Sequence, residues 1–149
     1  MNIGDICTRA VVSIAVDEPV RQAAELMRNH HVGSLVVTET ADGGLAPVGM
    51  LTDRDIAVGV VAKEVDPETI TVGDIMSTGA LIADEEDEVG EILEDMRKEG
   101  VRRVPVVDQT GILVGIFSLD DLLQFMALQM DLVAGIVGSQ RSEEARLRA

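Results

Sequence analysis

The chain has no tryptophan and no tyrosine, and only two of its 149 residues, Phe117 and Phe125, are aromatic. Because hydrophobic residues still make up 46% of the sequence, the core must consist of aliphatic side chains. Proteins that bind single-stranded nucleic acid stack bases on aromatic side chains, which are missing here. Basic residues are also scarce: 12 Lys and Arg stand against 27 Asp and Glu, for a formal net charge of −15. Nucleic acid, whose phosphates are neutralised by basic clusters, is therefore excluded as an expected partner.

Cysteine, signal sequences and long apolar runs are lacking as well. Cys7 is the only cysteine, so no internal disulfide can form, and we expect a small core residue rather than a reactive thiol. No signal peptide is recognisable. No uninterrupted apolar run reaches the roughly 18 residues that indicate a transmembrane helix. We therefore expect a soluble, cytoplasmic protein with no membrane partner.

The sequence contains an internal repeat that covers nearly its whole length. Gly4-Asp5-Ile6 returns as Gly73-Asp74-Ile75, and GMLTDRDI at 49–56 returns as GIFSLDDL at 115–122. The offset falls from 69 to 66 residues between these two places, which indicates a longer turn in the first repeat, at 41–47. Two copies are too few for a solenoid and indicate a pseudo-symmetric pair.

Both repeats predict the same order of elements after a short opening turn or helix: strand, helix, strand, strand, helix. The expected fold class is α+β (mixed α/β). The expected elements of the first repeat are 3–7, 11–16, 20–30, 34–38, 48–51 and a closing helix from Asp53. Those of the second are 72–76, 80–83, 89–99, 104–107, 114–117 and a closing helix from Leu119. The expected domains are a first repeat at 1–62, a linker at 63–71, a second repeat at 72–126 and a C-terminal extension at 127–149.

The last helix is longer than its counterpart in the first repeat. Its apolar residues recur at spacings of three and four, which is typical of one helix face. They are Leu119, Leu122, Met126, Met130, Val133 and Val137. We expect the first two turns to pack in the core. Beyond Met126 two alternatives stay open, a subunit interface or packing against the chain's own N-terminal segment, and the charged tail from Ser139 is expected to fray.

A hydroxyl and an aspartate three residues later open the closing helix of each repeat. The pairs are Thr52 with Asp55 and Ser118 with Asp121. One interpretation is a capping box, in which the side chains bond to the free N–H groups of the first turn. The other uses the same atoms for a ligand, because a helix N-terminus attracts phosphate and a carboxylate can accept hydrogen bonds from a ribose diol.

Other polar clusters favour less specific explanations. His30 and His31 are adjacent and have no ligand partner at metal-binding spacing, so we interpret them as histidines at a helix end. The acidic run Asp84–Glu88 fits a solvated helix start better than an acidic docking patch. The aspartates near Arg54 and at Asp120 could suggest Mg²⁺ chemistry, but no phosphate loop or nucleophile–base pair accompanies them. We expect no enzyme, no metal site and no required cofactor.

The repeated motifs resemble a known family. GDI followed by Cys or Met, then VGSLVV or VRRVPVVD, then GMLTDRDI or GIFSLDDL is similar to a tandem pair of CBS (cystathionine β-synthase) domains, a Bateman module, over about residues 3–126. The resemblance implies two pseudo-twofold-related β-α-β-β-α repeats packed sheet to sheet, with two clefts between them. It also implies an adenosine-containing ligand (AMP, ADP, ATP or S-adenosylmethionine) and a homodimer.

The resemblance also assigns residues to each cleft. One cleft takes Asp55 for the ribose, Thr52 near phosphate, and Leu81, Ile82 and Val101 beside adenine. The other takes Ser118 and Asp121, with Val12, Ser13, Val32 and Gly33 around the base. The phosphate-binding residues it implies are Arg102 and Arg103, with Arg54 as a third candidate. The first repeat has Gly33-Ser34 where the second has Arg102-Arg103. The second repeat also has Asp120 at the position of Arg54 in the first, which adds a negative charge beside the Ser118 cleft. We therefore expect the Thr52 cleft, with the arginine pair, to be the better anion site.

Two functions are consistent with these features. The first is a regulatory module that senses an adenosyl nucleotide and signals to a separate, unidentified protein through a dimer formed by the repeat faces and the C-terminal helix. The alternative is a scaffold for dimerisation or interaction, in which both hydroxyl–aspartate pairs are only helix caps.

Overall fold

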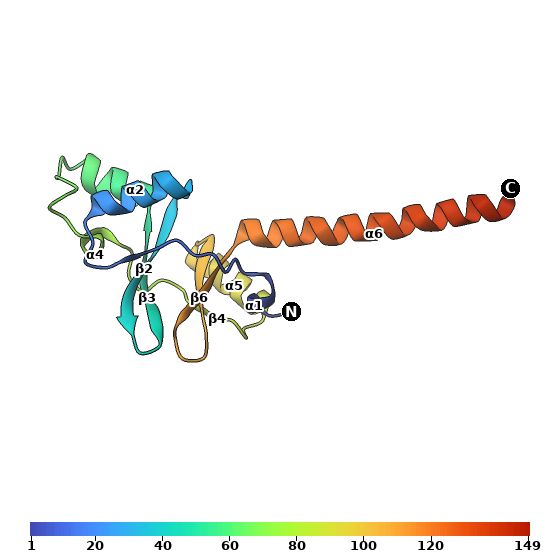
Figure 1. Ribbon diagram of the computed structural model, residues 1–149, viewed down its shortest axis with the longest axis horizontal. Coiled ribbons are helices and arrows are strands. Elements are labelled where there is room, and N and C mark those ends of the chain that lie inside the picture. Colours follow the sequence, from blue (N-terminus) through green and yellow to red (C-terminus); the bar gives the residue numbers. More distant parts are fainter.

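Each repeat folds into a three-stranded sheet with helices on one side (Figure 1). The structure is a computed structural model that describes residues 1–149. The elements of the first repeat are α1 Ile3–Ile6, β1 Ser13–Ala15, α2 Val20–His30, β2 Ser34–Ala41, β3 Gly44–Thr52, α3 Asp53–Ile56 and the π-helix η1 Ala57–Val61. Those of the second are α4 Val72–Ile75, β4 Ala83–Asp84, α5 Val89–Glu99, β5 Arg103–Val107, β6 Leu113–Ser118 and α6 Leu119–Arg148. The α+β class is confirmed.

The two sheets have the same topology. β1 pairs with β2 in parallel and β2 with β3 in antiparallel orientation, and β4, β5 and β6 repeat this arrangement. The parallel pair follows from the helix between its strands, which carries the chain back to the start of the sheet. α2 and α5 cover the sheets with buried residues spaced three and four apart, such as Val20, Ala23 and Met27 in α2. The sequence periodicity predicts that Ala23, Ala24 and Met27 face inward, but Ala24 is exposed.

The hairpin of the first repeat differs from the expected long turn at 41–47. β2 continues to Ala41 and β3 begins at Gly44, so the extra residues lengthen both strands. The turn that remains is Asp42-Gly43, and Gly43 has φ +95°, a conformation that glycine adopts without a steric penalty. Asp-Gly is a typical two-residue hairpin turn.

The short opening helices are exchanged between the repeats. Ile3 of α1 is fully buried in the core of the second sheet with Phe117, and Val72 of α4 is fully buried in the core of the first sheet with Leu51. The segment after each helix then pairs with the other repeat. Thr8 and Ile116 exchange two backbone hydrogen bonds of 2.8 and 2.9 Å. The packed units therefore differ from the sequence repeats at 1–9 and 70–77.

Glycine is required where the exchanged segments cross the sheets. A Cβ at Gly49 would lie 2.6 Å from the Ser77 carbonyl oxygen. At Gly115 it would lie 2.7 Å from the sulfur of Cys7 and 3.1 Å from the Thr8 carbonyl oxygen. Cys7 is half-buried against the second core, and burial raises the pKa of its thiol. This environment agrees with the expected core role.

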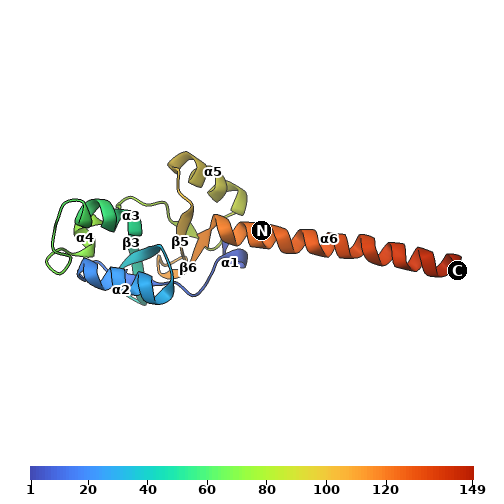
Figure 2. The ribbon, with the colours of Figure 1, turned by 90° about the horizontal axis from the view of Figure 1, so that it is seen from above.

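α6 leaves the body of the molecule after its first turns and projects away from it (Figures 1 and 2). Every residue from Met126 to Ala149 is exposed. Packing of this helix against the N-terminal segment beyond Met126 is therefore not observed, and the tail from Ser139 does not fray, because the helix continues to Arg148.

No uninterrupted apolar run of about 18 residues was expected, but α6 is long and apolar enough to cross a membrane by its length and average composition. An 18-residue window of α6 has a mean hydropathy of 1.5 with no more than 2 charged residues. Glutamine, glycine and aspartate interrupt the apolar residues of α6, so a search for an uninterrupted apolar run does not find this segment. The finding concerns the length and composition of α6 only.

Candidate functional site

Both hydroxyl–aspartate pairs form capping boxes. At the start of α6, the Ser118 Oγ accepts the Asp121 N–H at 3.2 Å and the Asp121 Oδ2 accepts the Ser118 N–H at 2.8 Å. At the start of α3, the corresponding distances between Thr52 and Asp55 are 3.1 and 2.9 Å. The local geometry of the two repeats is therefore the same, and any difference between the two sites must come from the residues around them.

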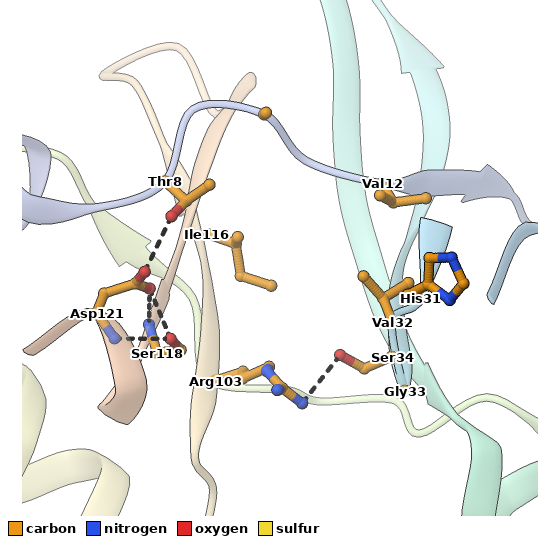
Figure 3. A pocket seen from close by; sticks show the side chains of 11 residues that line it. Thr8, Val12, His31, Val32, Gly33, Ser34, Arg103, Ile116, Ser118 and Asp121 are labelled. Carbon is orange, nitrogen blue, oxygen red and sulfur yellow. Dashed lines mark hydrogen bonds between the residues drawn. The ribbon is translucent and has the colours of Figure 1, made fainter. Parts of the chain in front are cut away.

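A cavity of about 250 Å³ lies beside the α6 cap, between the two repeats (Figure 3). It is lined by Thr8, Ala10, Val12, His31, Val32, Gly33, Ser34, Arg103, Ile116, Ser118 and Asp121. Val12 and Val32 come from the first repeat and Ile116 from the second, so apolar side chains of both repeats border the space. A small number of polar groups in a largely preformed hollow is the usual composition of a small-molecule site.

The polar groups of this cavity are already joined in pairs. The Asp121 carboxylate accepts a hydrogen bond from the Thr8 hydroxyl at 2.9 Å on Oδ1 and one from the Ser118 hydroxyl at 2.6 Å on Oδ2 (Figure 3). On the opposite side, Arg103 Nη1 donates to the Ser34 Oγ at 3.4 Å. A ligand with hydroxyl groups could exchange with Thr8 at Oδ1, and an anionic ligand could exchange with Ser34 at the guanidinium.

The charges around the cavity partly compensate one another. Arg102 Nη2 lies 4.0 Å from Asp120 Oδ1, and Arg103 Nη2 lies 3.8 Å from Asp120 Oδ2. These side chains are 44 to 75% exposed, and exposed pairs of this kind are weak. The negative charge that Asp120 adds beside the Ser118 cap is therefore balanced by two arginines that remain available to an anion.

The structure brings most residues expected for the Ser118 cleft together. Val12, Val32, Gly33, Ser118 and Asp121 all line the cavity. Ser13 does not line it and instead lies in β1, in register with Val36. Arg103 was expected in the other cleft, and the structure places its side chain here.

The residues expected around Thr52 do not gather in one comparable cavity. Asp55 lines a separate hollow with Lys63 and Asp74, and Val101 lines another with Arg102. Thr52, Leu81 and Ile82 line neither of these hollows nor the cavity at Ser118, and Arg54 is exposed. The difference has a steric reason. Gly33-Ser34 leaves room beside the Ser118 cap, and the side chains of the equivalent Arg102 and Arg103 extend toward Asp120 and Ser34, on the Ser118 side, instead of lining a cavity at Thr52.

Sequence reasoning missed several lining residues, notably Thr8 and His31. Thr8 reaches the cavity only because the opening segments are exchanged. His31 is the C-cap of α2 and has φ +53°, where its counterpart in the second repeat is Gly100 with φ +66°. A bulky residue at a position suited to glycine is a signal that could have drawn attention to it. No group of three or more His, Cys, Asp or Glu side chains that could hold a metal ion is present.

The fold and the site together define a tandem pair of small α+β units with a ligand-sized cleft between them. The chain belongs to the CBS domain family, whose sequence model matches residues 3–61 and again residues 72–128. It is 34% identical over 124 residues to an uncharacterized protein of Methanopyrus kandleri, a match that covers 83% of this chain but 62% of that relative. It is 36% identical over 121 residues to the CBS domain-containing protein YhcV of Bacillus subtilis, covering 81% of this chain and 82% of the relative.

Two similar solved structures contain adenosine derivatives. A CBS domain protein of Pyrobaculum aerophilum complexed with AMP has a TM-score of 0.74 at 28% identity, covering 90% of this chain and 99% of that one. A CBS domain pair in complex with 5′-methylthioadenosine and S-adenosyl-L-methionine has a TM-score of 0.71 at 25% identity, covering 87% and 98%. Matches to inosine-5′-monophosphate dehydrogenase, such as that of Methanocaldococcus jannaschii, cover only 22% of that enzyme.

Proposed function

We propose that this chain is a regulatory module that binds an adenosyl nucleotide, either AMP, ADP or ATP or S-adenosylmethionine, in the cavity at the start of α6. The observation that carries the proposal is the convergence of apolar side chains from both repeats, a helix N-terminus and Arg103 on one space of about 250 Å³. AMP and S-adenosylmethionine in the similar structures support this ligand class.

Each part of the ligand has a complementary group in the cavity. The base lies between Val12, Val32 and Ile116. The ribose hydroxyls donate to the Asp121 carboxylate, replacing the hydroxyl of Thr8. Phosphate, where the ligand has one, lies toward the N-terminal N–H groups of α6 and Arg103, because helix N-termini and guanidinium groups both favour anions.

The other cleft is a candidate for a second ligand. Its proposed residues are Thr52, Arg54, Asp55, Leu81, Ile82, Val101 and Arg102. Since Thr52 and Asp55 do not share one hollow, binding there requires side chains to move. We therefore propose that the Ser118 cleft fills first.

Regulation follows from the position of the ligand between the two repeats. A ligand shifts an equilibrium between two arrangements only by binding one of them better, and a ligand that contacts both repeats can do so. The arrangement includes a homodimer through the helical face of the first repeat. There Val58 and Val61 of η1 are 54% and 71% exposed beside an apolar hollow between α2 and η1. We propose a cytoplasmic protein with no catalytic role, whose output passes to a separate partner.

Isothermal titration calorimetry with AMP, ADP, ATP and S-adenosylmethionine tests the ligand class, and Asp121→Asn tests the site. The variant should bind roughly tenfold or more weakly, because a hydrogen bond to a charged group contributes about 1.5–3 kcal/mol. Asp55→Asn is the matched control, since it changes the same capping position in the other repeat. Equal affinities of the two variants would contradict the assignment of the Ser118 cleft as the primary site.

A second candidate function is an interaction scaffold with empty clefts, and the exposed apolar surface of α6 favours it. The two functions differ in thermal unfolding. A ligand at 100 times its dissociation constant stabilises a folded protein by about 2.7 kcal/mol. A scaffold would unfold at the same temperature with and without each nucleotide, followed by circular dichroism because the chain has no tryptophan or tyrosine.

A further inference from the structure

Asp120 places a carboxylate against both arginines beside the Ser118 cleft. Its Oδ2 lies 3.8 Å from Nη2 of Arg103, and its Oδ1 lies 4.0 Å from Nη2 of Arg102. The first repeat has Arg54 at the equivalent position. The Ser118 cleft therefore has a negative charge at a position where the other repeat has a positive one.

Arg103 presents only one side of its guanidinium group to the cavity. Its Nη1 donates to the Oγ of Ser34, which lines the cavity, whereas its Nη2 lies on the Asp120 side (Figure 3). Arg102 does not line this cavity. Apart from His31, Arg103 is the only basic residue of the lining. The cavity therefore offers a guanidinium group that suits one anionic group of a ligand.

Arg9 does not supply a further cation to the cavity. It lies between two residues that line the cavity, Thr8 and Ala10, but it is not a lining residue itself. Its Nη1 lies 3.0 Å from Glu85 Oε2, and its Nη2 donates to the Gly4 carbonyl oxygen at 3.1 Å. This guanidinium group is therefore occupied outside the cavity.

The start of α3 adds one charge of each sign near the cavity. Asp53 Oδ2 lies 3.1 Å from the position that a Cβ on Gly33 would take, and Arg54 follows Asp53 in the chain. These two residues leave the local balance of charge unchanged, while the whole chain carries a formal net charge of −15. A first anionic group can therefore bind Arg103, and each further one adds negative charge beside Asp120 with no further cation to bind.

We propose that Asp120 is a specificity-determining residue, through which the Ser118 cleft selects adenosine derivatives whose 5′ substituent carries a single anionic group. AMP, with one phosphate, and S-adenosylmethionine, with one carboxylate, meet this condition, and ADP and ATP do not. This assignment rests on the proposed function and narrows its ligand class. The ion pairs of Asp120 are exposed and weak, so they yield Arg103 to a first anionic group. The carboxylate stays beside that arginine and repels the further phosphates of ATP.

Isothermal titration calorimetry of the full chain with AMP, ATP and S-adenosylmethionine tests the selectivity. The unchanged chain should bind AMP more tightly than ATP. Asp120→Asn removes the charge with little change in size and should reduce this preference roughly fivefold at low salt, because charges about 7 Å apart still interact in water. The gain should shrink at high salt, which screens the charges. S-adenosylmethionine should bind the variant no more tightly, because its sulfonium and ammonium groups are positive.

Asp131→Asn is the matched control for the loss of one charge from α6. It lies eleven residues beyond Asp120 on the same helix, about 16 Å away at 1.5 Å per residue, which exceeds the Debye length of about 10 Å at 0.1 M salt. This variant should change the preference for AMP less than about twofold.

The outcomes separate the role of Asp120 from the proposed function. If the unchanged chain prefers ATP, if Asp120→Asn shifts the affinities for AMP and ATP equally, or if Asp131→Asn acts as strongly, the role of Asp120 is overturned and nucleotide binding stands. If the unchanged chain binds none of the three ligands, the proposed function is overturned and the role of Asp120 with it.

Discussion

His31 lines the cleft in a backbone conformation that lowers the stability of the fold. It holds φ +53° where the equivalent Gly100 carries no side chain, and it lines the cavity beside Val32. An L-residue in the left-handed region is strained by about 1–2 kcal/mol, partly offset by the greater freedom of glycine in the unfolded chain.

Substituting glycine at position 31 and histidine at position 100 should therefore change the free energy of unfolding in opposite directions. His31→Gly should raise the free energy of unfolding by up to about 1 kcal/mol and change nucleotide affinity. Gly100→His should lower stability by a similar amount and leave the affinity of the Ser118 cleft unchanged. Urea denaturation and calorimetry measure both, and a loss of stability in His31→Gly would contradict the strain argument.

The close crossings of the exchanged segments make specific glycines indispensable to the strands. Gly115→Ala would place a Cβ 2.7 Å from the Cys7 sulfur and 3.1 Å from a backbone oxygen, so we expect destabilisation by about 1–3 kcal/mol. Gly90 of α5 has nothing within 4 Å of its Cβ position, and Gly90→Ala should stabilise by about 0.5–1 kcal/mol through helix propensity. Thermal unfolding separates the two. Equal shifts in the same direction would mean that the segments do not cross as described.

The helices and strands were predictable to different degrees. α2 and α5 have the expected bounds, because Pro19 and Glu88 precede their first turns and residues with positive φ, His31 and Gly100, end them. The turn at 41–47 was overestimated because hairpin strands can extend through polar and exposed residues once pairing partners are present. The inward face of α2 was assigned from periodicity, which located Ala23 but also included Ala24.

The two clefts were expected to differ, but the arginine pair was assigned to the Thr52 cleft, whereas Arg103 lines the Ser118 cavity. The repeated hydroxyl–aspartate pairs identified both helix caps, since a capping box depends only on residues three positions apart. The space beside each cap depends instead on side-chain volume from the other repeat. The exchange that brings Thr8 to Asp121 could not be derived from the repeat, because both sheets offer the same pattern of apolar residues to α1 and α4.

The exchange also determines which piece of the molecule can fold by itself. Residues 10–77 include the first sheet, α2 and Val72, the α4 side chain that is fully buried in that core. Residues 1–66 have nearly the same length and follow the sequence repeat, but they lack Val72 and carry Ile3, whose core belongs to the other sheet. Losing a buried aliphatic side chain from a core costs about 2–5 kcal/mol, a large share of the stability of a domain near 60 residues.

Fragment 10–77 is therefore expected to show a cooperative thermal transition by circular dichroism, while fragment 1–66 shows none or one at a clearly lower temperature. Val72→Ala in fragment 10–77 is the control for the role of α4 and should move its transition toward that of 1–66. If the two fragments melt alike, the opening helices contribute little to the cores in which they lie. The two repeats would then be separable folding units. A ligand at Ser118 and Asp121 could then link their stabilities only through its own contacts with both repeats in the cleft.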